Sequence, residues 1–185
     1  LAEQVALNKA LLQAVPYHDQ IVITDMDGPQ IVAYGEELKI LQRRKHPLGD
    51  LLYLHEEEAV LMTYFRNNPL HLFALPSLLA ILLLQNNHAS MEQLLKMVRS
   101  IYPFLRSELF LIWRDEELPG VIAKTLDAMA AQNLVQRTEG DTWVVPGANT
   151  ADYARLHILS RALRQTLVRY HMTITVLNLR GSDKL

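Results

Sequence analysis

The side chains that most often carry chemistry are sparse in this sequence, and they do not fall into metal-binding patterns. Its 185 residues include seven histidines and no cysteine, so thiolate catalysis and disulfide bonds are excluded. No two histidines have the H-x3-H or H-E-x-x-H spacing of a helical zinc site, and His55-Glu56-Glu57 lacks a second histidine. The sequence therefore predicts no metal ion and no cofactor.

Two carboxylates, Asp25 and Asp27, follow the apolar segment Ile21–Thr24 and precede Gly28. A strand that ends in D-x-D-G resembles the first motif of haloacid-dehalogenase-type phosphatases. That resemblance implies Asp25 as the nucleophile, Asp27 as the general acid and base, and Mg²⁺ between them. However, Pro29 stands where that family has threonine or valine, and no later acidic pair completes a metal site. We favour a surface turn with two solvated carboxylates and keep the phosphatase as an alternative.

Positive charge gathers at Arg43, Arg44 and Lys45, between short apolar runs at residues 38–43 and 51–55. The proline and glycine in the intervening KHPLGD mark a turn, so we expect a β-hairpin with these basic residues at its tip. Such a cluster of basic residues usually indicates a solvated turn. The alternative is contact with anionic membrane lipid, to which each basic residue near the surface contributes roughly 1 kcal/mol.

Composition predicts one domain, or one domain with a small appendage. Half of the residues are hydrophobic, which excludes a disordered tail, and the net charge of −2 argues against nucleic-acid binding because no basic excess neutralises phosphates. The longest apolar stretch, Pro69–Leu84, has sixteen residues and includes Pro76. A spanning helix needs about twenty apolar residues. We therefore expect a buried core helix, with a helix dipping into one leaflet or packing on a membrane-proximal partner as the alternative.

Apolar residues at helical spacing predict most of the chain to be helical. Ser90 and Gln93 form a capping box at the start of one helix, which we expect to end at Pro103. Asn68 and the proline after it are expected to end the helix that begins at residue 56. The residues Ile21–Thr24 have β character. The expected helices are residues 2–15, 31–37, 56–68, 69–85, 91–103, 105–113, 118–132 and 149–177.

Residues 133–146 predict a second β-hairpin, with Trp143 on its second strand. A helix followed by such a hairpin is the outline of a winged-helix unit. The expected fold is mainly α: a helical domain with two small β-hairpins, one of them in a winged-helix-like arrangement. We expect an N-terminal helix and hairpin segment over residues 1–55, a helical core with the winged-helix-like hairpin and a long C-terminal helix over residues 56–178, and a tail over residues 179–185.

Three strings of sequence carry a resemblance to a known family. They are AVLMTYFRNNPLHLFALPSLLAILLLQNN at Ala59–Asn87, YPFLRSELFL at Tyr102–Leu111 and DEELP at Asp115–Pro119. Together they resemble the C-terminal part of the bacterial membrane-bound sn-glycerol-3-phosphate acyltransferases. The similarity covers roughly residues 6–178. It consists of matching strings rather than one short diagnostic motif.

The resemblance implies an enzyme on the cytoplasmic face of the bacterial inner membrane, peripheral or monotopic. Such an enzyme transfers an acyl group from acyl-CoA or acyl-carrier protein to the 1-hydroxyl of sn-glycerol 3-phosphate and yields lysophosphatidate for phospholipid synthesis. The family uses His-X4-Asp, in which the histidine is the general base. Five positions after the seven histidines of this chain stand Ile23, Leu51, Val60, Pro76, Gln93, Ala162 and Val176, none of them aspartate.

We therefore expect no catalytic residue in this chain and a catalytic domain N-terminal to it in the same polypeptide, consistent with a chain that opens with Leu1. Arg66, Asn67 and Asn68 belong to the best-matching string and are candidates for contact with substrate or with that domain. The alternative is structural: Arg66 pairs with a carboxylate while the asparagines cap a helix. A different class of function, a stand-alone winged-helix-like module that binds a protein, is the other hypothesis for the whole chain.

Overall fold

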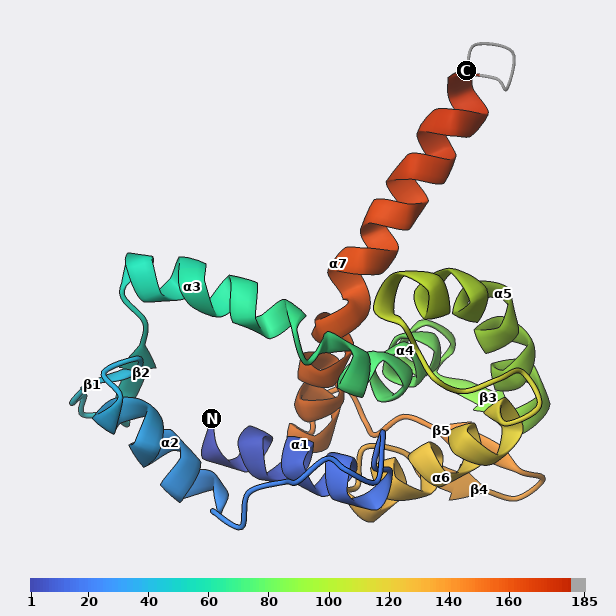
Figure 1. Ribbon diagram of the computed structural model, residues 1–185. Coiled ribbons are helices and arrows are strands. Elements are labelled where there is room, and N and C mark those ends of the chain that lie inside the picture. Colours follow the sequence, from blue (N-terminus) through green and yellow to red (C-terminus); the bar gives the residue numbers. More distant parts are fainter. Residues whose placement is uncertain (181–185) are drawn as a thin grey trace. The chain divides into compact units, whose positions relative to one another are not determined.

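The computed structural model describes residues 1–180. The chain divides into two compact units, and the division falls between Leu72 and Phe73. Both units are built mainly from helices, and two small antiparallel sheets complete them (Figure 1). The predicted mainly α fold with small hairpins is confirmed. The predicted division after residue 55 stays a prediction.

The first unit contains two helices packed side by side, then a hairpin and a third helix (Figure 1). Leu7, Leu11 and Val32 are buried in this unit. Gly28 permits a close approach of the first two helices, because a Cβ at this position would lie 2.2 Å from the carbonyl oxygen of Ala2. The elements are α1 (Ala2–Ala14), α2 (Gly28–Glu37), β1 (Gln42–Arg44), β2 (Leu51–Tyr53) and α3 (Glu56–Asn67).

The hairpin of β1 and β2 is present where the sequence predicted it, but the β character expected for Ile21–Thr24 is wrong. These four residues form no strand, and Val22 is almost fully exposed. β-branched residues favour a strand only where a neighbouring strand pairs with them and one face is covered. Neither condition is met here, so the segment is an irregular connection to α2.

The second unit has the element order of a winged helix. It contains most of α4 (Leu70–Asn86), then β3 (His88–Ser90), α5 (Met91–Leu109), α6 (Leu118–Ala131), β4 (Gln136–Thr138), β5 (Thr142–Val144) and α7 (Ala151–Arg180). The strand order is β3-β5-β4, with Trp143 of β5 opposite Ala89 and Arg137. The winged-helix-like arrangement is confirmed. The sequence analysis missed β3, which turns the expected hairpin into a three-stranded sheet.

Helix α4 is the centre of the second unit's core. Most residues from Ala74 to Leu83 are buried, as the prediction of a core helix required. Each large apolar side chain removed from water contributes roughly 1.5–3 kcal/mol before the cost in conformational entropy. Among the described residues, no single helix is long and apolar enough to cross a membrane. Only α3 and α4 counted together, bent at the break between them, meet that test of length and composition.

Helix α5 continues through Pro103 to Leu109, so the predicted stop at this proline and a separate helix over residues 105–113 are wrong. Tyr102 and Leu105 are buried on either side of the proline and hold the helix together across the missing hydrogen bond. The helix ends where Phe110 adopts a left-handed conformation with φ 55°. A glycine usually occupies this position, and its absence hid the end of the helix from sequence analysis.

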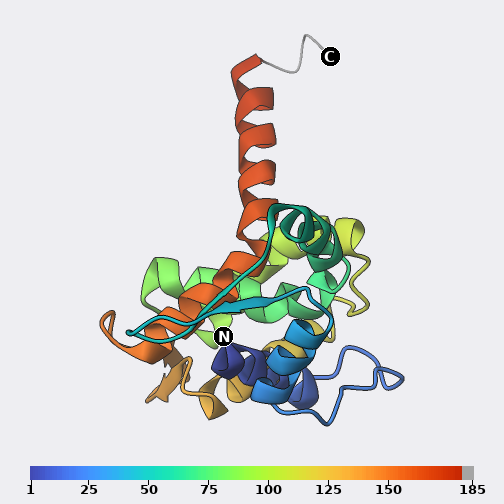
Figure 2. The same cartoon turned by 90° about the vertical axis from the view of Figure 1, so that its left-hand side faces the viewer.

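Helix α7 is joined to α4 by a buried hydroxyl. Ser77 Oγ donates to the carbonyl oxygen of Ser160 at 3.2 Å and accepts from the backbone N–H of Leu163 at 3.0 Å. A side chain that enters a helix's own hydrogen-bond ladder is a common cause of bending, and α7 changes direction partway along its length (Figure 2). Beyond Tyr170 the helix leaves the body of its unit, and residues 171–179 are all exposed.

Candidate functional site

The predicted contact residues Arg66, Asn67 and Asn68 lie where α3 ends. Arg66 is in the last turn, and Asn68 is the C-cap residue, whose backbone N–H donates to the carbonyl oxygen of Phe65 at 3.1 Å. The carbonyl oxygen of Asn68 lies 2.9 Å from Nδ1 of His71, and that imidazole packs edge-on against the ring of Tyr17. This corner therefore has a structural role. Contact of Arg66 with substrate or with another domain stays a prediction.

Helix α3 carries an apolar face that nothing in the first unit covers. This α3 apolar face has exposures of 47–70%, and no residue of the helix is buried. Three glutamates in the first turn stabilise the positive end of the helix dipole, and one cation lies in the last turn. An amphipathic helix with an exposed apolar face is typical of a surface that binds another molecule. The face consists of Val60, Leu61, Tyr64 and Phe65.

Of the three basic residues at the first hairpin, only Arg43 has a carboxylate partner among residues 1–180. Nε and Nη2 of Arg43 each donate to the Glu36 carboxylate at 2.8 Å, and Nη1 lies 3.3 Å from Asp50. The hydrogen bonds to Arg43 lower the pKa of the Glu36 carboxyl, while those to Glu36 and then Asp50 raise the pKa of Arg43. Arg44 and Lys45 are exposed. The predicted basic tip therefore presents two positive charges rather than three.

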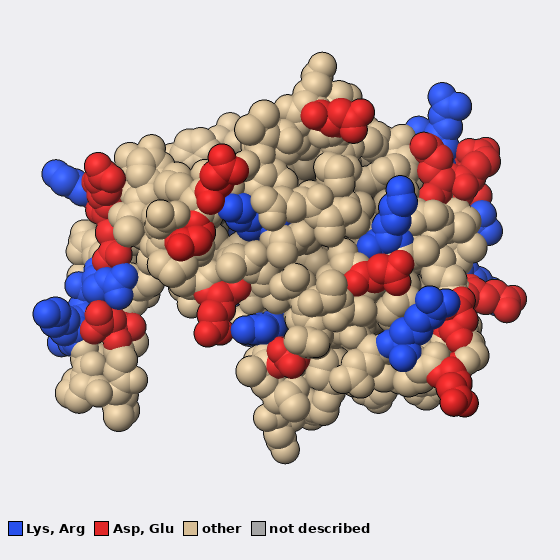
Figure 3. Space-filling model, turned by 90° about the horizontal axis from the view of Figure 1, so that it is seen from below, with Lys and Arg blue, Asp and Glu red and all other residues tan. Residues whose placement is uncertain are grey.

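Charges of both signs also lie close together elsewhere on the surface, as the face drawn in Figure 3 shows. The chain's net charge is only −2. A mixed surface of this kind gives little long-range attraction for a polyanion.

Asp27 has a structural role at the start of α2. Its side chain accepts a hydrogen bond from the backbone N–H of Gln30 at 2.8 Å, and the Gln30 side chain accepts from the Asp27 N–H at the same distance. This reciprocal pair is a capping box at the start of α2. Asp25 is exposed on the irregular segment before it. Over residues 1–180, no three acidic or histidine side chains lie close enough to hold a metal ion.

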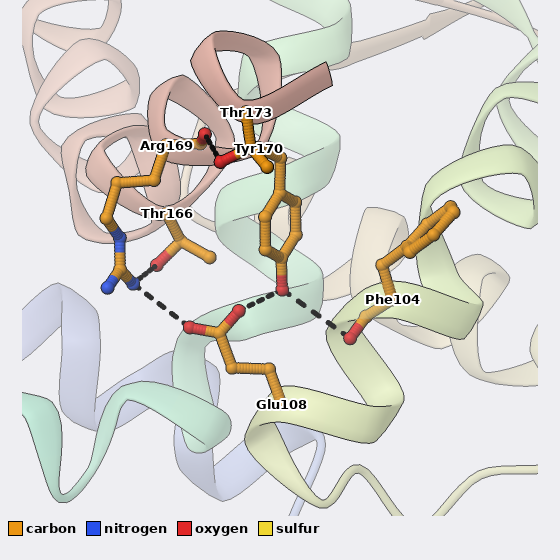
Figure 4. A network of polar contacts seen from close by, with 6 residues as sticks. All are labelled: Phe104, Glu108, Thr166, Arg169, Tyr170 and Thr173. Carbon is orange, nitrogen blue, oxygen red and sulfur yellow. Dashed lines mark hydrogen bonds and ion pairs between the residues drawn. The ribbon is translucent and has the colours of Figure 1, made fainter. Parts of the chain in front are cut away.

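A polar cluster that sequence analysis missed joins α5 to α7. The Tyr170 hydroxyl contacts the Glu108 carboxylate, and Nη2 of Arg169 lies 3.0 Å from the other oxygen of that carboxylate (Figure 4). Arg169 also donates to the Thr166 hydroxyl at 3.3 Å. Partial burial, followed by the hydrogen bond to Glu108, raises the pKa of Tyr170 to about 12.

The cluster stabilises the contact between two helices and has no feature of a reaction centre. Its tyrosine is less acidic than usual, which is the wrong direction for a general base at neutral pH. Glu108 and Tyr170 are 62 residues apart in sequence. No local pattern could have paired them.

The described residues thus define a mainly α protein module that contains a winged helix. The family described as the glycerol-3-phosphate acyltransferase C-terminal region matches residues 1–185. The chain belongs to this family, and the resemblance inferred from its sequence is confirmed.

Curated relatives agree with this assignment. The chain is 42% identical over all 185 residues to a protein of Pseudomonas aeruginosa named glycerol-3-phosphate acyltransferase. It is 40% identical to one of Ectopseudomonas mendocina and 38% identical to one of Pseudomonas fluorescens, both with the same name. In each comparison the whole chain is covered but only 22% of the relative. No solved structure matches the chain significantly.

Proposed function

We propose that this chain is the C-terminal, non-catalytic domain of a glycerol-3-phosphate 1-O-acyltransferase. The whole enzyme would transfer an acyl group from acyl-CoA or acyl-carrier protein to sn-glycerol 3-phosphate and release lysophosphatidate. The observation that carries the proposal is the family match over the entire chain. The non-catalytic role is supported by the sequence, in which no histidine is followed five positions later by aspartate. A transfer to an alcohol needs a base within hydrogen-bond reach of the hydroxyl.

The domain's role in this proposal is to brace the catalytic domain of the same polypeptide. The α3 apolar face supports this role, since its side chains are 47–70% exposed and include aromatic groups suited to a protein contact. Arg66 at the end of the same helix would then face the catalytic domain.

The parent enzyme would lie on the cytoplasmic face of the inner membrane. Arg44 and Lys45 are the residues of the basic tip that we assign to anionic lipid. With roughly 1 kcal/mol for each basic residue near such a surface, two residues assist binding but do not anchor the protein. Replacing both with glutamate should therefore weaken sedimentation of the parent enzyme with anionic vesicles without abolishing it. Unchanged sedimentation would exclude the tip.

The proposal is tested by domain replacement in the Pseudomonas aeruginosa relative. Removing the matching C-terminal region should abolish acyl transfer, and inserting this chain in its place should restore it. The chain alone, incubated with acyl-CoA and glycerol 3-phosphate, should leave both unchanged. Turnover by the chain alone, or full activity of the truncated relative, would overturn the proposed role.

The alternative is a stand-alone winged-helix module that binds a protein. The element order from α4 to β5 favours it. The recognition helix of such a module would be α6, which follows Asp115, Glu116 and Glu117, so a nucleic acid is a poor partner for it. A monodisperse, soluble chain that fails to restore the truncated relative would support this alternative over the first proposal.

A further inference from the structure

A groove of about 630 Å³ lies between α4 and α7, within the second unit. Its apolar surface comes from both helices: Ile81 and Leu84 from α4, and Leu167 and Val168 from α7. Three of these side chains are only partly buried and Val168 is exposed, so the groove presents apolar surface that a partner could cover. Two helices with a shallow apolar groove between them are a common seat for a third helix.

Three basic or titratable side chains line the same groove at a constant interval. His157, Arg164 and His171 are separated by seven residues each. Seven residues make two turns, about 10.5 Å along a helix, so the three span at most roughly 21 Å, because α7 changes direction partway along its length. Seven residues also fall about 20° short of two full turns, so the row winds slowly around α7.

Among residues 1–180, no aspartate or glutamate lines the groove beside this row. The Arg164 side chain makes no ion pair or hydrogen bond with any residue over the same range, and it is exposed. Arginine stays charged at all ordinary pH values. The centre of the row is therefore a fixed positive charge beside an apolar strip.

The spacing of these three side chains along α7 indicates which class of ligand the groove fits. A single phosphate is bound by cations that converge on one point, whereas these side chains are spread over about 21 Å of helix. A helix with an acidic residue at every seventh position and an apolar stripe beside it matches both the spacing and the apolar strip. We propose that the groove between α4 and α7 binds an acidic amphipathic helix of a partner protein. This surface is distinct from the α3 apolar face and does not depend on the proposed enzymatic role.

The test uses the whole chain and a designed peptide. The probe is a fluorescent helical peptide of about 21 residues, long enough to pass all three groove side chains, with leucine at the seam positions and glutamate at every seventh position. Fluorescence anisotropy at low salt should show saturable binding, which weakens as salt is added. A peptide of the same composition in scrambled order should not bind.

Charge reversal locates the binding surface. Arg164→Glu should weaken binding about tenfold or more, the effect of losing one charge pair and gaining a repulsion. Lys124→Glu is the matched control, because Lys124 is exposed on α6 and outside the groove. It should leave the affinity within about twofold. A peptide with lysine in place of its central glutamate should recover binding to Arg164→Glu, and circular dichroism should show that both variants are folded.

Three results would overturn the inference. One is the absence of binding to the unmodified chain, and another is equal binding of the scrambled peptide. The third is binding of anionic phospholipid vesicles that is lost in Arg164→Glu, which would assign the groove to lipid instead.

Discussion

Helices α3 and α4 are neighbours in the chain, yet α3 is exposed to solvent whereas α4 lies in a core. Helix α4 is apolar on all sides and has nine buried residues, whereas α3 has none and exposes its apolar face. The break at Asn68–Pro69 separates them. The comparison teaches that α4 stabilises the winged-helix unit by packing in its core, while the apolar face of α3 contributes little to the stability of its own unit.

The largest effect should come from the centre of α4. Leu79→Ala removes a fully buried side chain, and the lost packing and the cavity should lower the free energy of unfolding by about 2–5 kcal/mol. Urea denaturation followed by circular dichroism measures this. Val60→Ala on α3, where the side chain is 70% exposed, is the control and should stay within about 0.5 kcal/mol. Equal losses in the two variants would remove the distinction between the helices.

The next effect concerns the hydroxyl that joins α4 to α7. Ser77→Ala leaves the N–H of Leu163 and the carbonyl of Ser160 without this partner in a buried place. The cost should be about 1–3 kcal/mol in urea denaturation. Ser107→Ala, at an exposed position of α5, should have almost no effect. If both serines prove equally dispensable, the buried contact does not stabilise the unit.

A smaller effect is expected where α5 meets α7. Tyr170→Phe removes the hydroxyl that contacts Glu108 and should cost about 0.5–1 kcal/mol near neutral pH, because the contact is partly solvated. The pKa of Tyr170 is raised to about 12 from an ordinary 10. Its contribution is therefore fully present below pH 10 and is lost as pH rises toward 12. The stability difference between the two proteins should shrink over this range, and a constant difference would contradict the assignment.

The smallest effect should come from the exposed pair in the first unit. Glu36→Gln breaks the contact with Arg43, and solvent screening leaves such pairs little net stabilisation. Because Arg43 lowers the pKa of Glu36 below 4.5, the contribution is present above this value and disappears as pH falls through the lowered pKa. Urea midpoints measured from neutral pH downward should converge for the two proteins. Divergence at acidic pH would show a different role for Glu36.

Local signals in the sequence predicted much of the winged-helix unit. The Ser90 and Gln93 capping box is present as expected, and so is the hairpin that carries Trp143. What the sequence could not predict depends on distant partners. Strand β3 has three residues and exists because β5, more than 50 residues later, pairs with it. The helix through Pro103 likewise depends on burial of its neighbours rather than on propensity.

The candidate surfaces were harder to predict than the fold. Arg43 was correctly placed at a hairpin, but its two carboxylate partners come from α2 and from the hairpin loop, which the sequence did not connect to it. The contact between Glu108 and Tyr170 left no local signal either. The seven-residue interval between the three groove side chains of α7 matches no metal-binding spacing, although it does place side chains near one side of a helix.

The outer turns of α7 determine where the backbone amides of the protein exchange fastest with solvent. Residues 171–179 are all exposed, and the run Thr173–Val176 consists of β-branched residues that hold a helix poorly. Backbone amide protons there should exchange with deuterated water far sooner than those around Leu163.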